Sequence, residues 1–140
     1  TFSKYYAMAG LRVGYALGFE ELIGIMRKCS ASCNLNVCAQ KAAVAGLADQ
    51  EYYQEQKAKI VEGREYLEKE MAALGCRVYP SQSNFIYFDT GKDPAWIQEQ
   101  LMEKGIRIGA FEMSRVSVGT MEECQLFLQY LKEILETSQE

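Results

Sequence analysis

Three polar side chains near the start of the chain, Ser3, Lys4 and Arg12, could act together on a ligand. The guanidinium of an arginine is a planar fork of N–H donors that suits a phosphate group. A lysine amine attacks a carbonyl only when it is unprotonated, and desolvation or a neighbouring cation such as Arg12 favours that form. An amine, a hydroxyl and a guanidinium would together suit a phosphorylated aldehyde cofactor. On spacing alone, the simpler interpretation is that Lys4 and Arg12 are surface cations at the two ends of a strand.

A further arginine, Arg115, lies at the start of a second segment of interest. This segment, Ser-Arg-Val-Ser-Val-Gly-Thr at residues 114–120, alternates Val116 and Val118 with polar residues, which indicates a strand. An arginine in a strand must direct its charge to solvent, to an acidic partner or to a bound anion. The pattern alone favours a solvated arginine at the end of a strand.

Both segments resemble motifs of one protein family. Ser3-Lys4 followed by Ala-Gly-Leu-Arg-Val-Gly-Tyr at residues 9–15 is similar to the cofactor-lysine signature of class I and II pyridoxal-phosphate aminotransferases of fold type I. The similarity is greatest to the histidinol-phosphate aminotransferase branch. Residues 114–120 resemble the motif with which this family holds the substrate carboxylate. The two motifs occur in the family's order and at roughly its separation.

The resemblance implies a role for each candidate residue. Lys4 would form the internal aldimine with pyridoxal 5′-phosphate, while Ser3 and Arg12 would bind the cofactor phosphate. Arg115 would bind the substrate α-carboxylate, and Asn84, in an Asn-Phe pair similar to one in the family, is a second substrate-binding candidate. The implied reaction is transamination between an amino acid, or histidinol phosphate, and a 2-oxo acid. The family works as a dimer, so we expect a homodimer with small-molecule substrates.

One departure from the family pattern concerns the amino donor. Many histidinol-phosphate enzymes carry a second arginine at the end of the strand before the carboxylate motif, and this chain has Arg107 two positions earlier. In a strand, that shift keeps the side chain on the same face but moves it by about 7 Å. The departure weakens the case for histidinol phosphate and leaves another amino acid open as the donor.

Two other functions remain compatible with the same motifs. One is a decarboxylase or lyase that uses the same cofactor and fold. The other is a non-catalytic, aminotransferase-like domain that senses a ligand or mediates an interaction. Product analysis with 2-oxoglutarate separates a decarboxylase or lyase from a transaminase, because only a transaminase makes glutamate. The sequence upstream of residue 1 separates a non-catalytic domain from an enzyme, because a complete cofactor domain there would favour the enzyme.

The resemblance also predicts the domain organisation. The predicted fold class is α/β, the C-terminal part of a fold type I transferase. Residues 1–52 would be the end of the large cofactor-binding domain, and residues 53–140 the small C-terminal α/β domain with the helix that bridges to it. We expect the chain to be a fragment that lacks roughly the first 60% of such an enzyme. The fragment alone is therefore expected to be inactive.

Composition narrows the functional classes further. The chain has 140 residues, 49% of them hydrophobic, and a net charge of −4. A net negative charge without a basic run argues against a nucleic-acid partner. The sequence contains no run of about 20 apolar residues that could cross a bilayer and no signal-peptide pattern. We therefore expect a cytoplasmic protein without a membrane partner.

Histidine is absent, and five cysteines are present. Without an imidazole, this segment cannot contain a Ser/His/Asp or Cys/His triad. A zinc site formed by Cys29, Cys33 and Cys38 is conceivable, but no tight Cys-x-x-Cys pair supports it. We expect no metal, and we interpret all five cysteines as buried, reduced thiols.

The helices and strands that must position these residues are predicted from hydrophobic periodicity and from capping and turn residues. Residues 11–18 predict a short buried strand. Helical spacing covers residues 19–28, and Asn36 suits the N-cap of an alanine-rich helix over residues 37–48. Both Asn34 and Asn36 are interpreted first as structural residues, with a position near the active site as the alternative. A long helix capped by Asp49 should reach about residue 74 and end at Gly75.

From residue 75 onward, short strands alternate with helices. Strands are predicted at residues 76–79, 84–89, 106–111 and 115–119. Asp93 followed by Pro94 predicts the start of a helix that stops before residue 105. Thr120 and Glu123 form a capping box at the start of the last helix. Together these pieces predict a compact α/β module.

Overall fold

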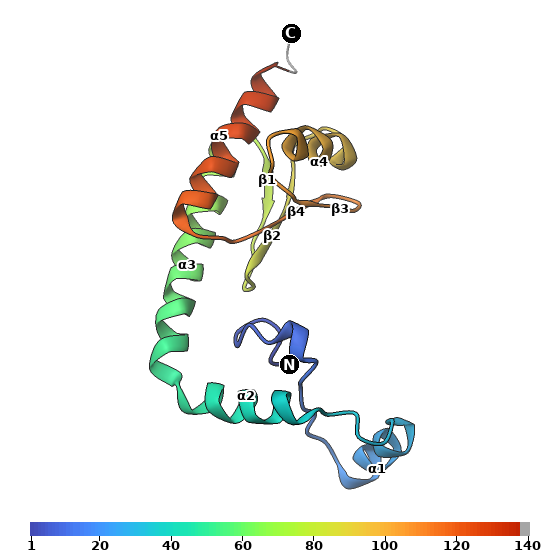
Figure 1. Cartoon of the computed structure of the whole chain (residues 1–140). Helices are drawn as coiled ribbons and strands as arrows, with labels where there is room; N and C mark the ends of the chain where they lie inside the picture. The colour runs from blue at the N-terminus through green and yellow to red at the C-terminus, as the bar shows by residue number, and fades with distance from the viewer. Residues whose placement is uncertain (138–140) are drawn as a thin grey trace. The chain divides into compact units, whose positions relative to one another are not determined.

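The computed structural model describes residues 1–137 (Figure 1). These residues divide into two compact units, Thr1–Lys57 and a second unit that begins at Ala58. None of the helices in the described part is long and apolar enough to cross a membrane. The assignment of residues 1–52 and 53–140 to two domains of a larger enzyme stays a prediction.

The first unit contains a short 3₁₀ helix, η1 (Ala9–Leu11), and two α-helices, α1 (Glu20–Cys29) and α2 (Val37–Ala48). The positions of α1 and α2 confirm the prediction from periodicity. The Asn36 side chain accepts a hydrogen bond from the Ala39 amide at 2.8 Å, which is the predicted N-cap of α2. The cap satisfies one of the amides that a helix leaves without a partner in its first turn.

The predicted strand over residues 11–18 is wrong. The segment runs from η1 through a turn at residue 12 into backbone without regular secondary structure and without a sheet partner. A strand needs a neighbouring strand for its backbone hydrogen bonds, and the described part of the first unit contains none. Val13 instead accepts one backbone bond from the Phe2 amide at 3.2 Å, which closes residues 2–13 into a loop.

Helix α3 (Gln50–Ala73) begins in the first unit and continues into the second. Asp49 Oδ1 accepts a bond from the Tyr52 amide at 3.4 Å, at the predicted start of the helix. Gly75 follows its end with φ of +83°, a left-handed conformation that glycine adopts without steric cost. Along α3, Gly63, Leu67 and Met71 are buried.

The second unit is built on a four-stranded antiparallel sheet with strand order β1-β2-β4-β3. Its strands are β1 (Arg77–Tyr79), β2 (Phe85–Asp89), β3 (Gly109–Ala110) and β4 (Ser114–Ser117). Helix α4 (Pro94–Glu103) connects β2 to β3. Because both strands pair antiparallel with β4, β2 and β3 run parallel to each other with β4 between them.

The strand predicted at residues 106–111 is much shorter than expected. Its first residues belong to the end of α4, since the Gly105 amide donates to Met102 and the Ile106 amide to Leu101. Gly105 has φ of +80°, as is common just after a helix. Only Gly109 and Ala110 remain to pair with β4.

One face of the sheet carries the hydrophobic core. Along β2, Ile86 and Phe88 are fully buried, while the alternate residues Phe85 and Tyr87 are half-buried on the opposite face. Side chains of α3, α4 and α5 (Met121–Thr137) meet in the same core. Leu67, Leu101 and Leu131 are its fully buried leucines.

The predicted caps of α4 and α5 are present. Asp93 Oδ1 accepts a bond from the Ala95 amide at 3.0 Å. In the capping box of α5, the Thr120 amide donates to Glu123 Oε2 at 2.7 Å and the Glu123 amide donates to Thr120 Oγ1 at 3.3 Å. These bonds fix the direction in which the chain leaves β4.

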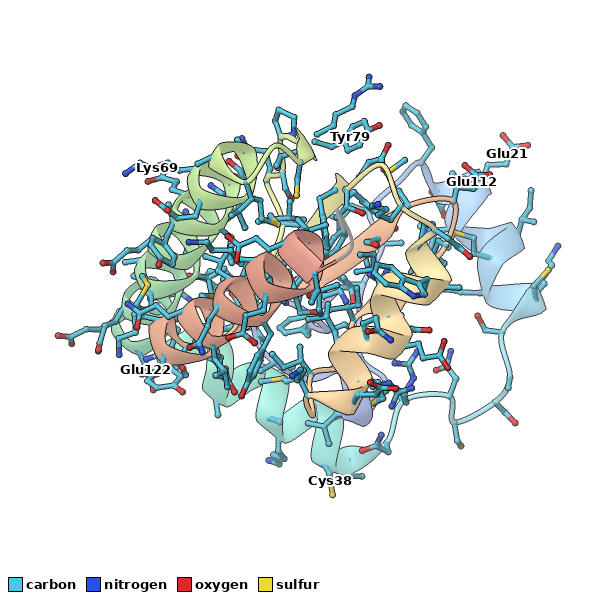
Figure 2. The ribbon with its side chains drawn as sticks, turned by 90° about the horizontal axis from the view of Figure 1, so that it is seen from above. Glu21, Cys38, Lys69, Tyr79, Glu112 and Glu122 are labelled. Atoms are coloured by element: carbon cyan, nitrogen blue, oxygen red, sulfur yellow. The ribbon has the colours of Figure 1, made fainter. Side chains whose placement is uncertain are left out.

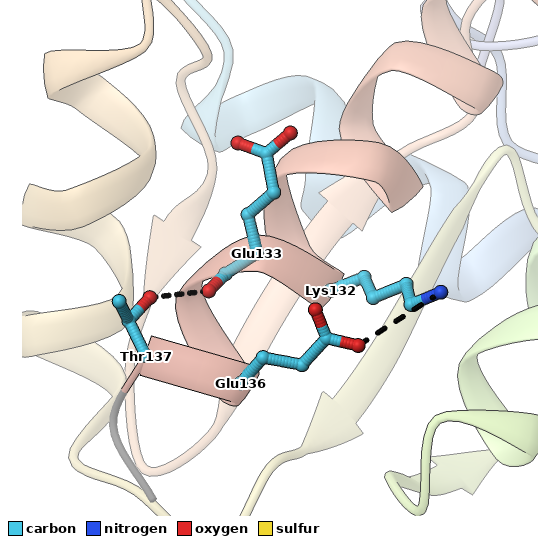
Figure 3. Close-up of polar contacts among 4 residues, drawn as sticks. All are labelled: Lys132, Glu133, Glu136 and Thr137. Atoms are coloured by element: carbon cyan, nitrogen blue, oxygen red, sulfur yellow. Dashed lines mark hydrogen bonds and ion pairs between the residues drawn. The ribbon is translucent and has the colours of Figure 1, made fainter. Parts of the chain in front are cut away.

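The far end of α5 is held by local polar contacts (Figure 3). Lys132 and Glu136 form an ion pair at 3.8 Å, and the Thr137 hydroxyl donates to the Glu133 carbonyl. Because both charged side chains are mainly exposed, the pair contributes only about 0.3–0.5 kcal/mol.

The cysteines fall into two groups, which corrects the interpretation of all five as buried. Cys29, Cys33 and Cys38 are exposed, and Figure 2 shows Cys38 projecting from the ribbon. Cys76 and Cys124 are buried. Alanine-rich α2 buries only its small residues, so Cys38 faces outward. Within residues 1–137, no group of cysteine, aspartate and glutamate side chains could hold a metal ion.

Alkylation should separate these two groups. Burial, with a smaller contribution from the charge of Asp89, raises the pKa of the Cys76 thiol from 9.0 to about 11. The thiolate is the reactive form, so iodoacetamide at pH 8 should modify Cys29, Cys33 and Cys38 well before Cys76. Peptide mapping over time measures this order. In denaturant all five should react at similar rates, and equally fast labelling of Cys76 in the folded protein would contradict the placement.

Gly63 gives a test of packing inside the second unit. A Cβ at this position would lie 2.9 Å from Val118 Cγ1 and 3.6 Å from Cys124 Sγ. A short β-branched side chain has little freedom to move away. Overpacking costs about 1–3 kcal/mol, and the better helix propensity of alanine returns up to about 1 kcal/mol. We expect Gly63→Ala to lower the free energy of unfolding by about 1 kcal/mol in denaturant titrations.

The matched control for Gly63→Ala is Glu62→Ala. Glu62 precedes Gly63 in α3 and is exposed. Its replacement should change the free energy of unfolding by no more than about 0.5 kcal/mol. A Gly63→Ala protein as stable as the wild type would show that the contact between α3 and the end of β4 is looser than described.

Candidate functional site

The loop of residues 2–13 is held by buried apolar side chains. The Phe2 amide donates to Val13 at 3.2 Å, and the Met8 amide donates to Phe2 at 3.0 Å. Phe2, Met8 and Val13 are buried together with Ala39 and Ala43 of α2. The apolar residues of the loop therefore anchor it to α2, while its polar residues stay at the surface.

Ser3 and Lys4 lie on the outer side of this loop. Ser3 is half-buried, and its hydroxyl accepts a bond from the Thr1 hydroxyl at 2.8 Å. Lys4 is exposed, and its carbonyl accepts a bond from the Ala7 amide at 3.0 Å. A reactive lysine is expected to be desolvated. Residues 1–57 do not supply this desolvation, because they leave Lys4 exposed.

Arg12 follows η1 in an unusual backbone conformation. Its φ of +57° and ψ of +52° lie in the left-handed region, where a non-glycine residue costs about 1–2 kcal/mol. The Arg12 guanidinium donates through Nη1 to the Ala9 carbonyl at 2.7 Å. One of its five N–H donors is thus bonded within the loop, and the exposed side chain retains others for a ligand.

Asn36 connects α2 to the backbone next to Arg12. Its Nδ2 donates to the Leu11 carbonyl at 3.0 Å, while its Oδ1 caps α2. The sequence predicted the cap but not the bond to Leu11. The two residues are 25 positions apart, and no local pattern indicates such a contact.

An aromatic cluster braces the segment that follows Lys4. The ring of Tyr53 lies 5.7 Å from that of Tyr5 and 4.8 Å from that of Tyr6, and its hydroxyl donates to the Tyr6 carbonyl at 3.5 Å. Gly46 of α2 permits this packing, because a Cβ there would lie 3.2 Å from Tyr6 Cδ1. The first turn of α3 thus helps to hold the loop.

In the second unit, Arg115 lies on the open face of the sheet. It pairs with Tyr87 of β2 on one side and with Gly109 of β3 on the other. Its guanidinium carbon is 5.3 Å from the centre of the Phe85 ring and 4.9 Å from that of Phe111. Two aromatic faces therefore orient this cation. Among the residues described, no carboxylate lies within ion-pair distance of Arg115.

An open surface pocket of about 570 Å³ lies on the same face of the sheet. Its lining comes from β1, β2 and the turn between β3 and β4: Tyr79, Tyr87, Phe111, Glu112 and Met113. Tyr87 and Phe111 also flank Arg115. The pocket therefore shares two of its lining residues with the surroundings of Arg115, which is not itself part of the lining.

Asn84 immediately precedes β2 and is half-buried. Its carbonyl accepts a bond from the Val118 amide at 2.9 Å, and its Oδ1 accepts one from the Ser83 hydroxyl at 3.4 Å. Asn84 and Arg115 thus belong to neighbouring segments of one sheet. Ser3, Lys4 and Arg12 belong to one loop of the first unit.

Arg107 does not lie in a strand, because β3 begins at Gly109. The expectation that Arg107 lies in a strand over residues 106–111 is therefore wrong. Arg107 is exposed, and it lines a separate cavity of about 380 Å³ with Val118 and Leu126 among other residues. The Ile106 amide, just before Arg107, donates to Leu101 at the end of α4 and is therefore not used for strand pairing.

Comparison with solved structures places this architecture among the fold type I aminotransferases. The histidinol-phosphate aminotransferase from Sinorhizobium meliloti in complex with pyridoxal-5′-phosphate matches with a TM-score of 0.87 and 32% identity, over 99% of this chain and 40% of that one. The chain belongs to the family of class I and II aminotransferases, whose family model matches residues 1–131.

Relatives by sequence agree with this assignment. The histidinol-phosphate aminotransferase of Moorella thermoacetica is 36% identical over 96% of this chain and 36% of its own length. Histidinol-phosphate aminotransferase 2 of Carboxydothermus hydrogenoformans is 37% identical over 97% of this chain and 39% of its own length. The chain thus spans less than half the length of the relatives it matches.

Proposed function

We propose that the full-length protein containing this chain is an aminotransferase that uses pyridoxal 5′-phosphate. The main support is the loop of residues 2–13, which carries an amine, a hydroxyl and a guanidinium on the outer side of an apolar anchor. Relatives of this chain are named histidinol-phosphate aminotransferases, and one is described in complex with that cofactor. The partners we propose are small-molecule substrates and a second copy of the protein.

The residues of the loop fit the cofactor chemically. Arg12 offers several N–H donors and Ser3 one hydroxyl, which suits a phosphate. Lys4 has the amine that can condense with an aldehyde. When bound, pyridoxal phosphate supplies an electron sink for the bonds at the substrate α-carbon. Lys4 would hold the cofactor and then move a proton to and from the substrate α-carbon.

The substrate carboxylate would be held by Arg115, with Asn84 as a second polar contact. The rings of Phe85 and Phe111 lie against the Arg115 guanidinium, whose planar fork of donors suits a carboxylate. The acceptor would be a 2-oxo acid. The donor would be an amino acid or histidinol phosphate, and the position of Arg107 outside the sheet favours an amino acid.

The first experiment tests Lys4 directly. The full-length protein is incubated with pyridoxal phosphate, reduced with borohydride and digested, and the labelled peptide is identified by mass spectrometry. We expect the label on Lys4. Lys4→Ala and Lys4→Arg should both lose the label and at least 95% of glutamate formation from 2-oxoglutarate, roughly the loss expected for a covalent amine. Activity in either variant clearly above the remaining 5% would rule out the assignment of Lys4.

A lysine elsewhere in the first unit provides the control for Lys4. Lys41 of α2 is exposed, and Lys41→Ala should keep both the label and the activity. Glutamate formation also separates a transaminase from a decarboxylase or lyase of the same fold. If Lys4 is labelled but no glutamate forms, the proposed cofactor site would stand and the proposed reaction would have to be replaced by a decarboxylase or lyase reaction.

Arg115 should be sensitive even to a change that keeps its charge. Lysine provides a point charge without the planar fork, so Arg115→Lys should lower kcat/KM for 2-oxoglutarate by about 10- to 100-fold. Steady-state kinetics measures this value. Arg77→Lys is the matched control, because Arg77 lies in the same sheet with its guanidinium over the ring of Tyr79 at 5.1 Å. Equal kinetics for the two variants would argue against carboxylate binding by Arg115.

A further inference from the structure

The backbone at Arg12 needs support from outside its own loop. Its left-handed conformation is unfavourable for an arginine, and its amide donates to Ala9 only at 3.4 Å. The orientation of the peptide plane between Leu11 and Arg12 is coupled to φ of Arg12. Whatever holds the Leu11 carbonyl therefore also holds the direction in which the Arg12 side chain leaves the backbone.

The Asn36 side chain holds that carbonyl. Its Nδ2 donates to Leu11 at 3.0 Å, and its Oδ1 accepts from Ala39 at 2.8 Å. Both ends of the amide are used, so rotating it by half a turn would break both bonds. A serine or an aspartate could replace the cap, since either has an oxygen that accepts from the Ala39 amide. Neither should replace the bond to Leu11, because an ionised aspartate has no donor and a serine has one oxygen on a shorter side chain in place of the two separate amide atoms of Asn36.

The other end of this connection is firmly placed. Ala39 is fully buried at the start of α2, and Ala43 packs one turn further along with Phe2 and Val13 of the loop. The start of α2 is thus fixed against the same loop that carries Arg12. A rigid support of this kind is what a side chain needs in order to meet a ligand in one orientation.

We propose that Asn36 is a positioning residue for Arg12, and through Arg12 for the phosphate group of the cofactor. This inference rests on the proposed function. In this positioning role Asn36 acts through the Leu11–Arg12 peptide. The role is therefore separate from the N-cap that Asn36 provides for α2. The two roles make different predictions, because a cap supports the fold whereas positioning of Arg12 affects only ligands that carry a phosphate.

The test compares two cofactor forms in the full-length protein. Dissociation constants for pyridoxal phosphate and for pyridoxal, which lacks the phosphate, are measured by absorbance titration in wild type, Asn36→Ser and Asn36→Asp. Both substitutions keep an acceptor for the cap, and the serine adds no charge. We expect the preference for pyridoxal phosphate over pyridoxal to fall by about fivefold or more in both, with the affinity for pyridoxal unchanged.

A double-mutant cycle shows whether the effect passes through Arg12. Arg12→Ala should also reduce the preference, and adding Asn36→Ser to it should reduce the preference no further. Gln40→Glu is the matched control, since Gln40 on the same helix donates through its amide to the Leu35 carbonyl at 3.2 Å. It should leave the preference as in the wild type.

Three results would overturn the inference, and they are distinguishable. An unchanged preference in both Asn36 variants would leave the residue as a cap alone. An equal loss of affinity for both cofactor forms, with a lower melting temperature, would indicate a purely structural role. A wild-type protein that binds neither form would overturn the proposed function, and this inference with it.

Discussion

Burial on only one face of the sheet is the constraint on which the second unit depends. Residues alternate between two faces along a strand, so the burial of Ile86 and Phe88 places Phe85 and Tyr87 on the opposite face. Pairing then places Arg115 beside Tyr87, on the face without helices of this unit. A slip of one residue would turn Arg115 into the core, where an unpaired charge is very unfavourable. The packing of the core thus selects the position of the arginine.

In the first unit, the candidate polar side chains are placed at the surface without a sheet. Its loop is fixed by a few buried side chains against α2 and by the two bonds of Asn36. A loop can direct a side chain through backbone conformations that helices and strands do not use. Arg12, which is exposed and has a left-handed backbone, is an example. Local backbone strain of this kind persists only where the surroundings hold it in place.

Sequence reasoning succeeded where local signals decide the structure. The bounds of α2 followed from Asn36 and a run of alanines, and the start of α5 followed from the capping box of Thr120 and Glu123. It failed where the outcome depends on distant partners. The residues after η1 have the composition of a strand but no neighbour to pair with in the described part of their unit. The exposure of Cys38 depends on which side of α2 meets the loop, and a helix with so many small residues does not signal that side.

The candidate site residues were found by motif, but motifs did not reveal what supports them. The sequence offered Arg12 as a phosphate ligand and Arg115 as a carboxylate ligand, and the structure gives the two side chains different environments. The Arg115 guanidinium carbon lies over two aromatic rings, 5.3 Å from the centre of Phe85 and 4.9 Å from that of Phe111. Arg12 uses one donor on its own loop and depends on Asn36 for its backbone. An anion bound at Arg115 would therefore meet a cation that lies against two rings of the sheet unit. An anion at Arg12 would meet a cation that is bonded to its own loop and whose backbone is held by the amide of Asn36. The second arrangement is the more easily altered by substitution at a residue that never contacts the ligand.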